Sequence, residues 1–135
     1  MPITTIWDSE EEGIIRFVFQ GRWTWADIEQ AREAGVEMSR ASSHPAVCVI
    51  ADMRNTSIMP EGAIQQTRNS LKTPLPPNNL NFTVIVGASM FVEMFYNVLK
   101  RIFQAQMTST YAIASSLEEA RALIEQRRQE QAKNG

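Results

Sequence analysis

The sequence predicts a single α/β domain built around a mixed, mostly parallel β-sheet. Two apolar runs, residues 47–51 and 82–86, are continuous rather than alternating, which is typical of strands buried on both faces. Segments with helical periodicity separate these runs, and this arrangement indicates parallel strands joined by right-handed crossovers. The chain has 135 residues, of which 44% are hydrophobic and 21% charged, so it can bury one core without a disulfide or a structural metal. We expect the order β-β-α-β-α-β-α-β-α, with the helices packed against the sheet.

The first two elements are expected to form an antiparallel β-hairpin. Residues 3–7 and 13–20 have the composition of strands, and the acidic segment 8–12 between them is typical of a solvated turn. The second strand has an apolar face and a mixed face, formed by alternate residues: Ile15, Phe17 and Phe19 on one side, and Ile14, Arg16, Val18 and Gln20 on the other.

A helix follows Gly21, which ends the second strand. Thr24 and Asp27 have the spacing of a capping box, with Asp in place of the usual Glu or Gln. The helix is expected from about Trp25 to Ala41, before the breaking segment 42–45. Its core-facing positions are Ile28, Ala31, Ala34 or Gly35, and Met38. Trp23 and Trp25 either form an exposed binding surface or staple the hairpin to this helix.

Two helices are expected between the strand at residues 47–51 and the end of the sheet. The first covers residues 60–71, with Pro60 in its first turn, and an extended proline-containing loop follows over residues 72–79. The second follows the strand at residues 82–86 and runs from Met90 to about Gln106, with Ser89 as its cap.

A short strand and a helix close the domain. The strand is Tyr111–Ala114, and Ser116 with Glu119 forms a second capping box at the start of the helix. The apolar side of this helix consists of Leu117, Ala120, Leu123 and Ile124. We assign residues 1–125 to one domain and residues 126–135 to a polar helix end or a frayed tail.

Charge and composition argue against several partner classes. The chain has 13 basic and 15 acidic residues, and its Lys and Arg are scattered without a stripe, so we expect no nucleic-acid partner. The N-terminus lacks a secretory pattern, and no apolar run approaches the ~18 residues that span a bilayer. We therefore expect a cytoplasmic protein with no membrane partner. The single cysteine, Cys48, lies in an apolar strand and is expected to be a buried hydrophobic residue rather than a reactive thiol.

The sequence shows no catalytic machinery, and we expect a protein without enzymatic activity. His44 is the only histidine and has no Cys, Asp or Glu at metal-ligand spacing, so we expect neither a metal nor a cofactor. A triad of Ser57, His44 and Asp52 lacks a nucleophile elbow. The strand between His44 and Asp52 would also separate them by ~25 Å, at ~3.3 Å per residue.

The segment that follows the strand at residues 47–51 is the natural position for a functional site. Open α/β sheets bind ligands in the crevice outside the carboxyl ends of their strands. Asp52 there either binds a ligand or accepts backbone N–H bonds that fix its own loop, and the structural role is favoured. The full set of candidates is Asp52, Arg54, Asn55, Thr56, Ser57 and Glu61. Residues 87–89 before a helix offer a place for an anion, but one glycine falls short of a phosphate-binding motif.

The long helix from Met90 carries more apolar surface than one packed face requires. Such a surface indicates either contact with a partner, most simply a second copy in a twofold homodimer, or deeper burial within the monomer. The candidate interface residues are Val92, Tyr96, Phe103 and Met107.

Four segments, together with the order of the elements, point to a known family. They are residues 17–24 (FVFQGRWT), residues 49–52 (VIAD) with Gly62 downstream, residues 84–89 (VIVGAS) and residues 116–120 (SLEEA). Over nearly the whole chain this pattern resembles the STAS domain, the SpoIIAA-like fold of bacterial anti-sigma-factor antagonists. The resemblance implies a regulatory domain that works by binding proteins.

The resemblance fails at the position that is phosphorylated in the phospho-regulated members of the family. There, a Ser begins the helix after the strand that ends in Asp, and its phosphorylation dissociates the complex. Here Pro60 or Glu61 occupies that position, and neither can be phosphorylated. Glu61 either imitates a permanent charge or simply suits the first turn of a helix. Thr56 and Ser57 lie just upstream, as possible phosphorylation sites or, more ordinarily, as turn residues.

The sequence therefore predicts a non-enzymatic STAS-like regulatory domain that binds a protein partner or itself as a homodimer. The alternative is a domain that binds a small ligand, namely an anion, a nucleotide or a lipid, in the crevice between the Asp52 segment and the turn at Gly87. An enzyme ranks third because acid–base candidates are sparse.

Overall fold

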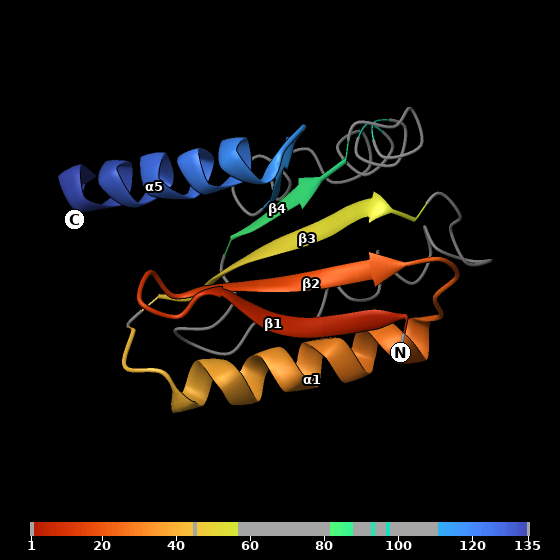
Figure 1. Cartoon of the computed structure of the whole chain (residues 1–135). Coiled ribbons are helices and arrows are strands. Elements are labelled where there is room, and N and C mark those ends of the chain that lie inside the picture. Colours follow the sequence, from red (N-terminus) through yellow and green to blue (C-terminus); the bar gives the residue numbers. More distant parts are fainter. Residues whose placement is uncertain are drawn as a thin grey trace.

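A five-stranded mixed β-sheet forms the centre of the molecule (Figure 1). This computed structural model describes residues 2–44, 46–56, 82–87, 93, 97 and 111–134. The strands are β1 (Ile3–Ser9), β2 (Ile14–Gln20), β3 (Cys48–Asn55), β4 (Thr83–Val86) and β5 (Tyr111–Ala114), and they lie side by side in this order. Strand β1 is antiparallel to β2, and β2 to β5 are parallel to one another. The predicted α/β class, mixed sheet and hairpin are confirmed.

Two helices of the described part of the chain pack on opposite faces of this sheet: α1 (Trp25–Ala41) and α5 (Leu117–Asn134). The apolar clusters on the α1 side contain the strand residues Ile15, Phe17, Val49 and Ile85. The cluster on the opposite side contains their neighbours Ile14, Ile50, Val84 and Val86, together with Ala120 and Ile124 of α5. Residues of the two faces alternate along each strand because successive side chains point to opposite sides of the sheet. The helices predicted over residues 60–71 and from Met90 to Gln106, and the loop 72–79, lie outside the described residues, except that Glu93 and Asn97 are helical and exposed.

Helix α1 begins and ends where the sequence predicts. Thr24 is its N-cap, and the side chains of Thr24 and Asp27 bond reciprocally to each other's backbone N–H groups, as in a capping box. Trp23, just before the cap, is buried, and its ring meets that of Phe19 edge to face at 5.3 Å between centroids. Trp23 therefore staples the hairpin to α1 rather than forming an exposed surface. The side chain of Trp25 lies outside the described residues.

Helix α5 is anchored to the sheet by arginines as well as by its short apolar side. Ala120 and Ile124 are buried, with Leu117 and Leu123 packed against the same cluster, as predicted. Arg127 stacks 4.5 Å above the centroid of the Phe82 ring, and Arg128 donates to the backbone carbonyls of Glu12, Gly13 and Ala46. These contacts fall within residues 126–134, which are helical.

The first turn of α5 differs from the predicted capping box. The N–H of Glu119 donates to Oγ of Ser116 as expected, at 3.1 Å. The carboxylate of Glu119, however, accepts from the N–H and the hydroxyl of Ser115. The carboxylate of Glu119 thus binds Ser115, which lies one position upstream of Ser116, the predicted partner.

The acidic segment 8–12 is not wholly a solvated turn, so that prediction was wrong for its first two residues. Asp8 and Ser9 belong to β1, where the register shifts between Trp7 and Ser9. The turn is confined to residues 10–13. The physical reason is that the carboxylate of Asp8 binds Arg16 and Arg121 on the sheet face, and these contacts extend the strand beyond Trp7.

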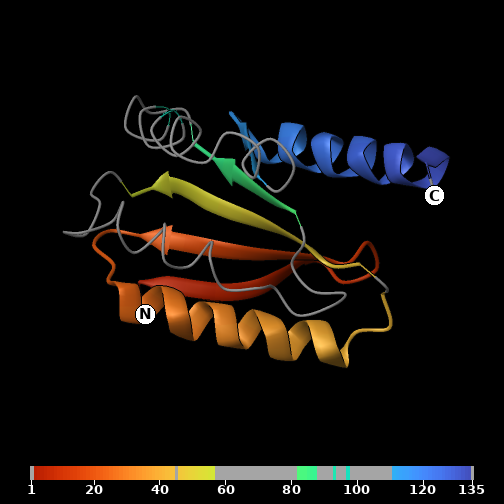
Figure 2. The same ribbon diagram turned by 180° about the vertical axis from the view of Figure 1, so that it is seen from behind.

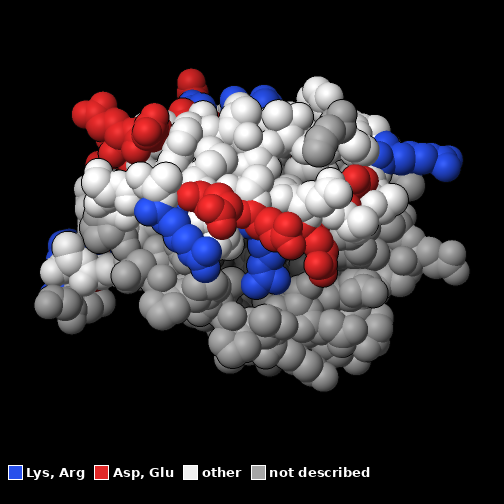
Figure 3. Space-filling model, turned by 90° about the horizontal axis from the view of Figure 1, so that it is seen from below, with Lys and Arg blue, Asp and Glu red and all other residues white. Residues whose placement is uncertain are grey.

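Surface charges on the α1 side of the molecule are mixed. Figure 3, seen from that side, shows acidic and basic side chains interspersed, without a large basic area among the described residues. An example is the pair of Arg40 and Glu37 on α1, with 3.5 Å between Nη1 and Oε1. Within the part of the chain that the structure describes, no helix combines the length and apolar character needed to cross a bilayer. Cys48 is buried as predicted, and this burial raises the pKa of its thiol.

Two glycines with left-handed backbone conformations allow a matched test of the close packing between the hairpin turn and His44. Gly13 (φ +67°) lies against His44, and a Cβ there would be 2.5 Å from Cγ of the ring, whereas Gly21 (φ +60°) faces open space. Gly13→Ala should lower the free energy of unfolding by about 2 to 5 kcal/mol, from left-handed strain and overpacking together. Gly21→Ala should cost only the strain, about 1 to 2 kcal/mol. Urea denaturation followed by circular dichroism measures both losses, and equal losses would contradict the close contact with His44.

Candidate functional site

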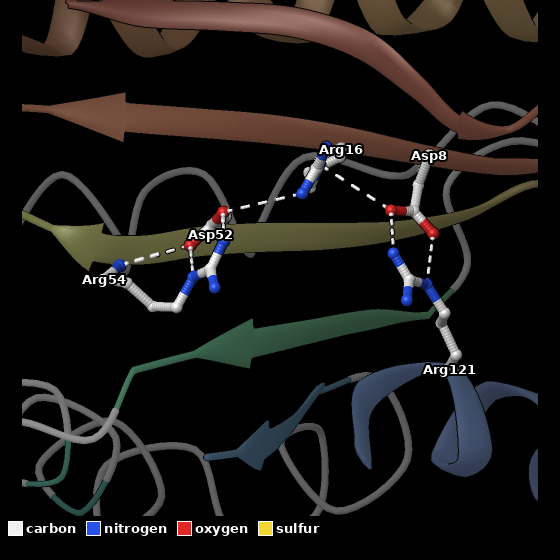
Figure 4. Close-up of polar contacts among 5 residues, drawn as sticks. All are labelled: Asp8, Arg16, Asp52, Arg54 and Arg121. Atoms are coloured by element: carbon white, nitrogen blue, oxygen red, sulfur yellow. Dashed lines mark hydrogen bonds and ion pairs between the residues drawn. The ribbon is translucent and has the colours of Figure 1, made fainter. Parts of the chain in front are cut away.

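Five charged side chains meet on the sheet face that carries α5 (Figure 4). We call them the Asp–Arg network; they are Asp8 of β1, Arg16 of β2, Asp52 and Arg54 of β3, and Arg121 of α5. The strand register brings them together, because Arg16 pairs with Ile50 of β3 and Val18 pairs with Asp52. Arg16 and Asp52 are therefore diagonal neighbours on the face that the sequence predicts to be mixed.

Each carboxylate in the network accepts two short hydrogen bonds from one guanidinium. Nε and Nη2 of Arg54 lie 2.8 Å from the two carboxylate oxygens of Asp52. Arg121 binds Asp8 in the same bidentate way, also with both distances at 2.8 Å. Paired bonds of this kind fix the orientation of both groups as well as adding energy.

Arg16 lies between the two carboxylates and joins the pairs into one chain of charges. Its Nε is 3.6 Å from Oδ1 of Asp8, and its Nη1 is 3.9 Å from Oδ2 of Asp52. Nε of Arg16 is buried without a hydrogen bond, so its contribution is ionic. The network thereby links three strands and α5 on one face of the sheet.

The two carboxylates are buried, whereas two of the arginines reach solvent. The exposed fractions of the side chains are 1% for Asp8 and 3% for Asp52, against 44% for Arg54 and 46% for Arg121. The hydrogen bond from Arg121 holds the pKa of Asp8 below its usual range, even though burial opposes this. Burial likewise raises the pKa of Asp52, but bonds from the side chain and N–H of Arg54 outweigh it, and the net shift is downward. Both groups are therefore ionised at neutral pH and make weak bases.

Asp52 accepts a backbone N–H bond, as the structural alternative predicts, but its position in the strand differs from the prediction. The N–H of Arg54 donates to Oδ1 of Asp52 at 3.3 Å, in addition to the two side-chain bonds. Strand β3 continues through Arg54 to Asn55, so Asp52 lies inside the strand rather than at its end. The strand continues because Asn55 still pairs with Gln20 of β2 across a register shift. Arg54 and Asn55 are exposed.

Thr56 forms a second polar contact at the carboxyl end of β3. Its hydroxyl accepts from Nε1 of Trp23 at 3.1 Å and donates to the carbonyl of Gly21 at 2.6 Å. The N–H of Gly21 in turn donates to the carbonyl of Asn55. Thr56 is buried and its hydroxyl is engaged, so it serves the turn and is inaccessible to a kinase in this structure.

The remaining predicted site residues lie outside the described residues. These are Ser57 and Glu61 of the proposed switch segment, and the interface candidates Val92, Tyr96, Phe103 and Met107. Conversely, sequence reasoning missed three members of the network: Asp8, Arg16 and Arg121. The one available signal was Arg16, a charged residue on the inner face of a strand. Its partners follow only from the fold.

A pocket lies at the carboxyl ends of β4 and β5. Its volume is about 520 Å³, and its described lining comprises Gly87, Glu93, Asn97, Ile113, Ala114, Ser115 and Glu119. Gly87 was predicted to border such a crevice, but Asp52 is not among these lining residues. The carboxylates of Glu93 and Glu119 disfavour an anion beside them.

Neither metal coordination nor similarity to known proteins adds to this picture. Among the residues with described positions, no group of three or more His, Cys, Asp or Glu side chains is arranged to hold a metal ion. Comparisons of the chain with protein-family models, curated proteins and solved structures gave no match in any of the three.

The lowered pKa values of Asp8 and Asp52 predict a loss of stability in acid. The stabilisation is complete above the ordinary pKa of Asp, about 3.9, and is lost as the pH falls through the lower pKa of the folded state. We expect the free energy of unfolding to fall between about pH 5 and pH 2, and we expect Asp52→Asn to flatten this dependence. Urea denaturation at a series of pH values measures it.

Two variants control this experiment. At neutral pH, Asp52→Asn should cost about 2 to 3 kcal/mol, below the usual loss for a buried pair because Arg54 reaches solvent. Glu29→Gln, at an exposed position of α1, should leave the curve unchanged. Parallel curves for the wild type and Asp52→Asn would contradict the assignment of the acid dependence to the network.

Proposed function

We propose that the chain is a non-enzymatic, STAS-like regulatory domain of the cytoplasm that acts by binding another protein or a second copy of itself. The observation that carries this proposal is that Arg54 already binds Asp52, the carboxylate nearest the expected functional position. Its two oxygens accept three hydrogen bonds from Arg54, which leaves it poorly suited to act as a base. These bonds support a structural rather than a catalytic role for Asp52.

The order of the described elements supports the STAS-like assignment. They follow one another as β-β-α-β-β-β-α, which fits the general α/β class, and the two helices proposed over residues 60–71 and 90–106 lie outside the described residues apart from the helical positions 93 and 97. The antiparallel first strand and the four parallel strands fit the expected mixed sheet.

The contact surface that we propose begins at the exposed end of β3. Arg54 is held by Asp52 and keeps nearly half of its side chain in solvent, so its remaining N–H groups are already oriented for a partner. Asn55 beside it is exposed, and Ser57 to Glu61 follow in the sequence. Because Thr56 is engaged and position 60 or 61 has no hydroxyl, signalling through this surface depends on docking rather than on phosphorylation at those positions.

A measurement of mass in solution tests the homodimer in this proposal. We expect multi-angle light scattering to give twice the mass of one chain for the wild type. Phe103→Asp should give the mass of one chain, because a charge in an apolar interface is costly. Arg22→Asp, at an exposed position, should remain dimeric. Identical monomeric masses for the wild type and Phe103→Asp would exclude the interface on the helix from Met90.

The pocket at the ends of β4 and β5 favours a second candidate function, the binding of a small ligand. Its volume of about 520 Å³ lies in the usual range for ligand sites, and its place at the strand carboxyl ends is where open α/β sheets bind ligands. Of the expected ligand classes, an anion or a nucleotide would need to keep its phosphates away from Glu93 and Glu119, whereas a lipid chain has no such constraint.

Thermal unfolding with added ligands separates the two functions. If the chain is a protein-binding domain, inorganic phosphate, a panel of nucleotides and a lysophospholipid should each change Tm by less than about 1 °C. A true ligand at a hundred times its Kd adds about 2.7 kcal/mol, which raises Tm by several degrees. Such a rise, abolished in Asn97→Trp at the pocket wall and retained in Arg22→Trp, would replace the first proposal with the second.

A further inference from the structure

Strand β1 is the edge of the sheet, and one side of its backbone has no partner strand among the described residues. The N–H of Gln20 donates to the carbonyl of Pro2 at 2.8 Å, which fixes the alternation of the antiparallel ladder. In that alternation Thr4 and Ile6 bond to Val18 and Arg16 of β2. The residues between them, Ile3, Thr5 and Trp7, therefore direct their N–H and C=O groups away from the sheet.

A groove runs between this open edge and α1. Figures 1 and 2 show α1 lying along β1 in both views, and the hydroxyl of Thr5 donates to the carbonyl of Ala31 at 3.4 Å. Between the two elements lies a cavity of about 400 Å³, lined by residues 3–5 of β1 and by Asp27, Gln30, Ala31 and Ala34 of α1. The cavity exists because the two alanines are too small to fill the space between helix and strand.

We propose that an extended segment of a partner protein binds in this groove as a sixth strand beside β1. The outward N–H and C=O groups on every second residue of β1 have no partner strand among the described residues, and they are complementary to an extended backbone. Side chains of Ile3 and Thr5 lie on the α1 side of the sheet, so the residue opposite Thr5 in an added strand projects into the same cavity. The cavity accepts an apolar side chain, and Asp27, the charged residue of its described lining, favours a Lys or Arg nearby.

A second copy of the chain fits this edge less well than a single peptide strand. Antiparallel pairing of two β1 strands about a twofold axis places both copies of α1 on the same face of the joined sheet. Each α1 already flanks its own β1, so the two helices compete for one space (Figures 1 and 2). A peptide brings no helix with it. The inference rests on the proposed protein-binding function but assigns a surface separate from the end of β3.

Selection of a random octapeptide phage library against the immobilised full chain tests this inference. We expect selected peptides to carry an apolar residue flanked by Lys or Arg. On binding of the tightest synthetic peptide, the N–H groups of Ile3, Thr5 and Trp7 should become protected from hydrogen exchange.

Substitutions at the edge and in the cavity then locate the site. Thr5→Pro removes an outward N–H and leaves the ladder to β2 intact, and Ala34→Phe fills the cavity, so each should weaken binding at least about tenfold. Thr5→Val keeps the N–H and Glu29→Phe lies at an exposed position of α1, so both should bind within about twofold of the wild type. Circular dichroism shows whether each variant is folded. If only one of Thr5→Pro and Ala34→Phe folds, that variant alone is enough for the test.

Three results would overturn the inference. The first is the absence of any selected peptide, and the second is equal binding by the wild type, Thr5→Pro and Ala34→Phe. The third is a wild-type dimer that Thr5→Pro dissociates, because a second copy then occupies the edge. A monomeric mass for both the wild type and Phe103→Asp contradicts only the dimer interface of the proposed function, since peptide selection examines the β1 edge directly.

Discussion

Two buried carboxylates on the face of the sheet that carries α5 are the constraint on which the rest of the structure depends. Ionised Asp8 and Asp52 lie beside the apolar cluster that includes Ile50 and Val86, where an unpaired charge would cost several kcal/mol. Only the bidentate arginines, with Arg16 between them, make this arrangement tolerable. A slip of one residue in β1 or β3 would turn a carboxylate into the apolar layer under α1, so the network also fixes the register of the strands.

Arginines inside and outside the network together hold α5, since the helix has a small apolar side. Ala120 and Ile124 are its buried residues, and much of the remaining contact is made by three guanidinium groups. Arg121 binds Asp8, Arg127 covers the ring of Phe82, and Arg128 holds three carbonyls around the hairpin turn and the start of β3. The α1 layer, by contrast, is an ordinary apolar core built on Ile15, Phe19 and Val49. The sheet therefore has one face held by packing and another held jointly by packing and charge.

Local patterns predicted the elements well and the site only in part. The continuous apolar runs identified β3 and β4, the capping box identified the start of α1, and alternation in β2 identified the mixed face. Asp8 was placed in a turn because three glutamates follow it, and its true partner, Arg121, is 113 residues away. No periodicity carries information about such a pair. The same limit applies to the end of β3, where pairing of Asn55 with Gln20 sets the strand length. It also applies to Glu119, whose carboxylate binds Ser115 rather than Ser116.

The network bears on both proposed surfaces because it reaches from one to the other. Asp8 lies in β1, whose outer edge is the groove, and Arg54 lies at the end of β3, with Arg16 between them. Asp8, Arg16, Asp52 and Arg121 each have an ionic partner on another strand or on α5, so β1 and β3 are fixed relative to each other before anything binds. A fixed edge has less conformational entropy to lose than a mobile one, and preorganisation of this kind is what lets a short added strand bind with useful affinity. The ion pairs that hold Asp8 and Asp52 thus favour the sheet as a rigid template for protein contacts.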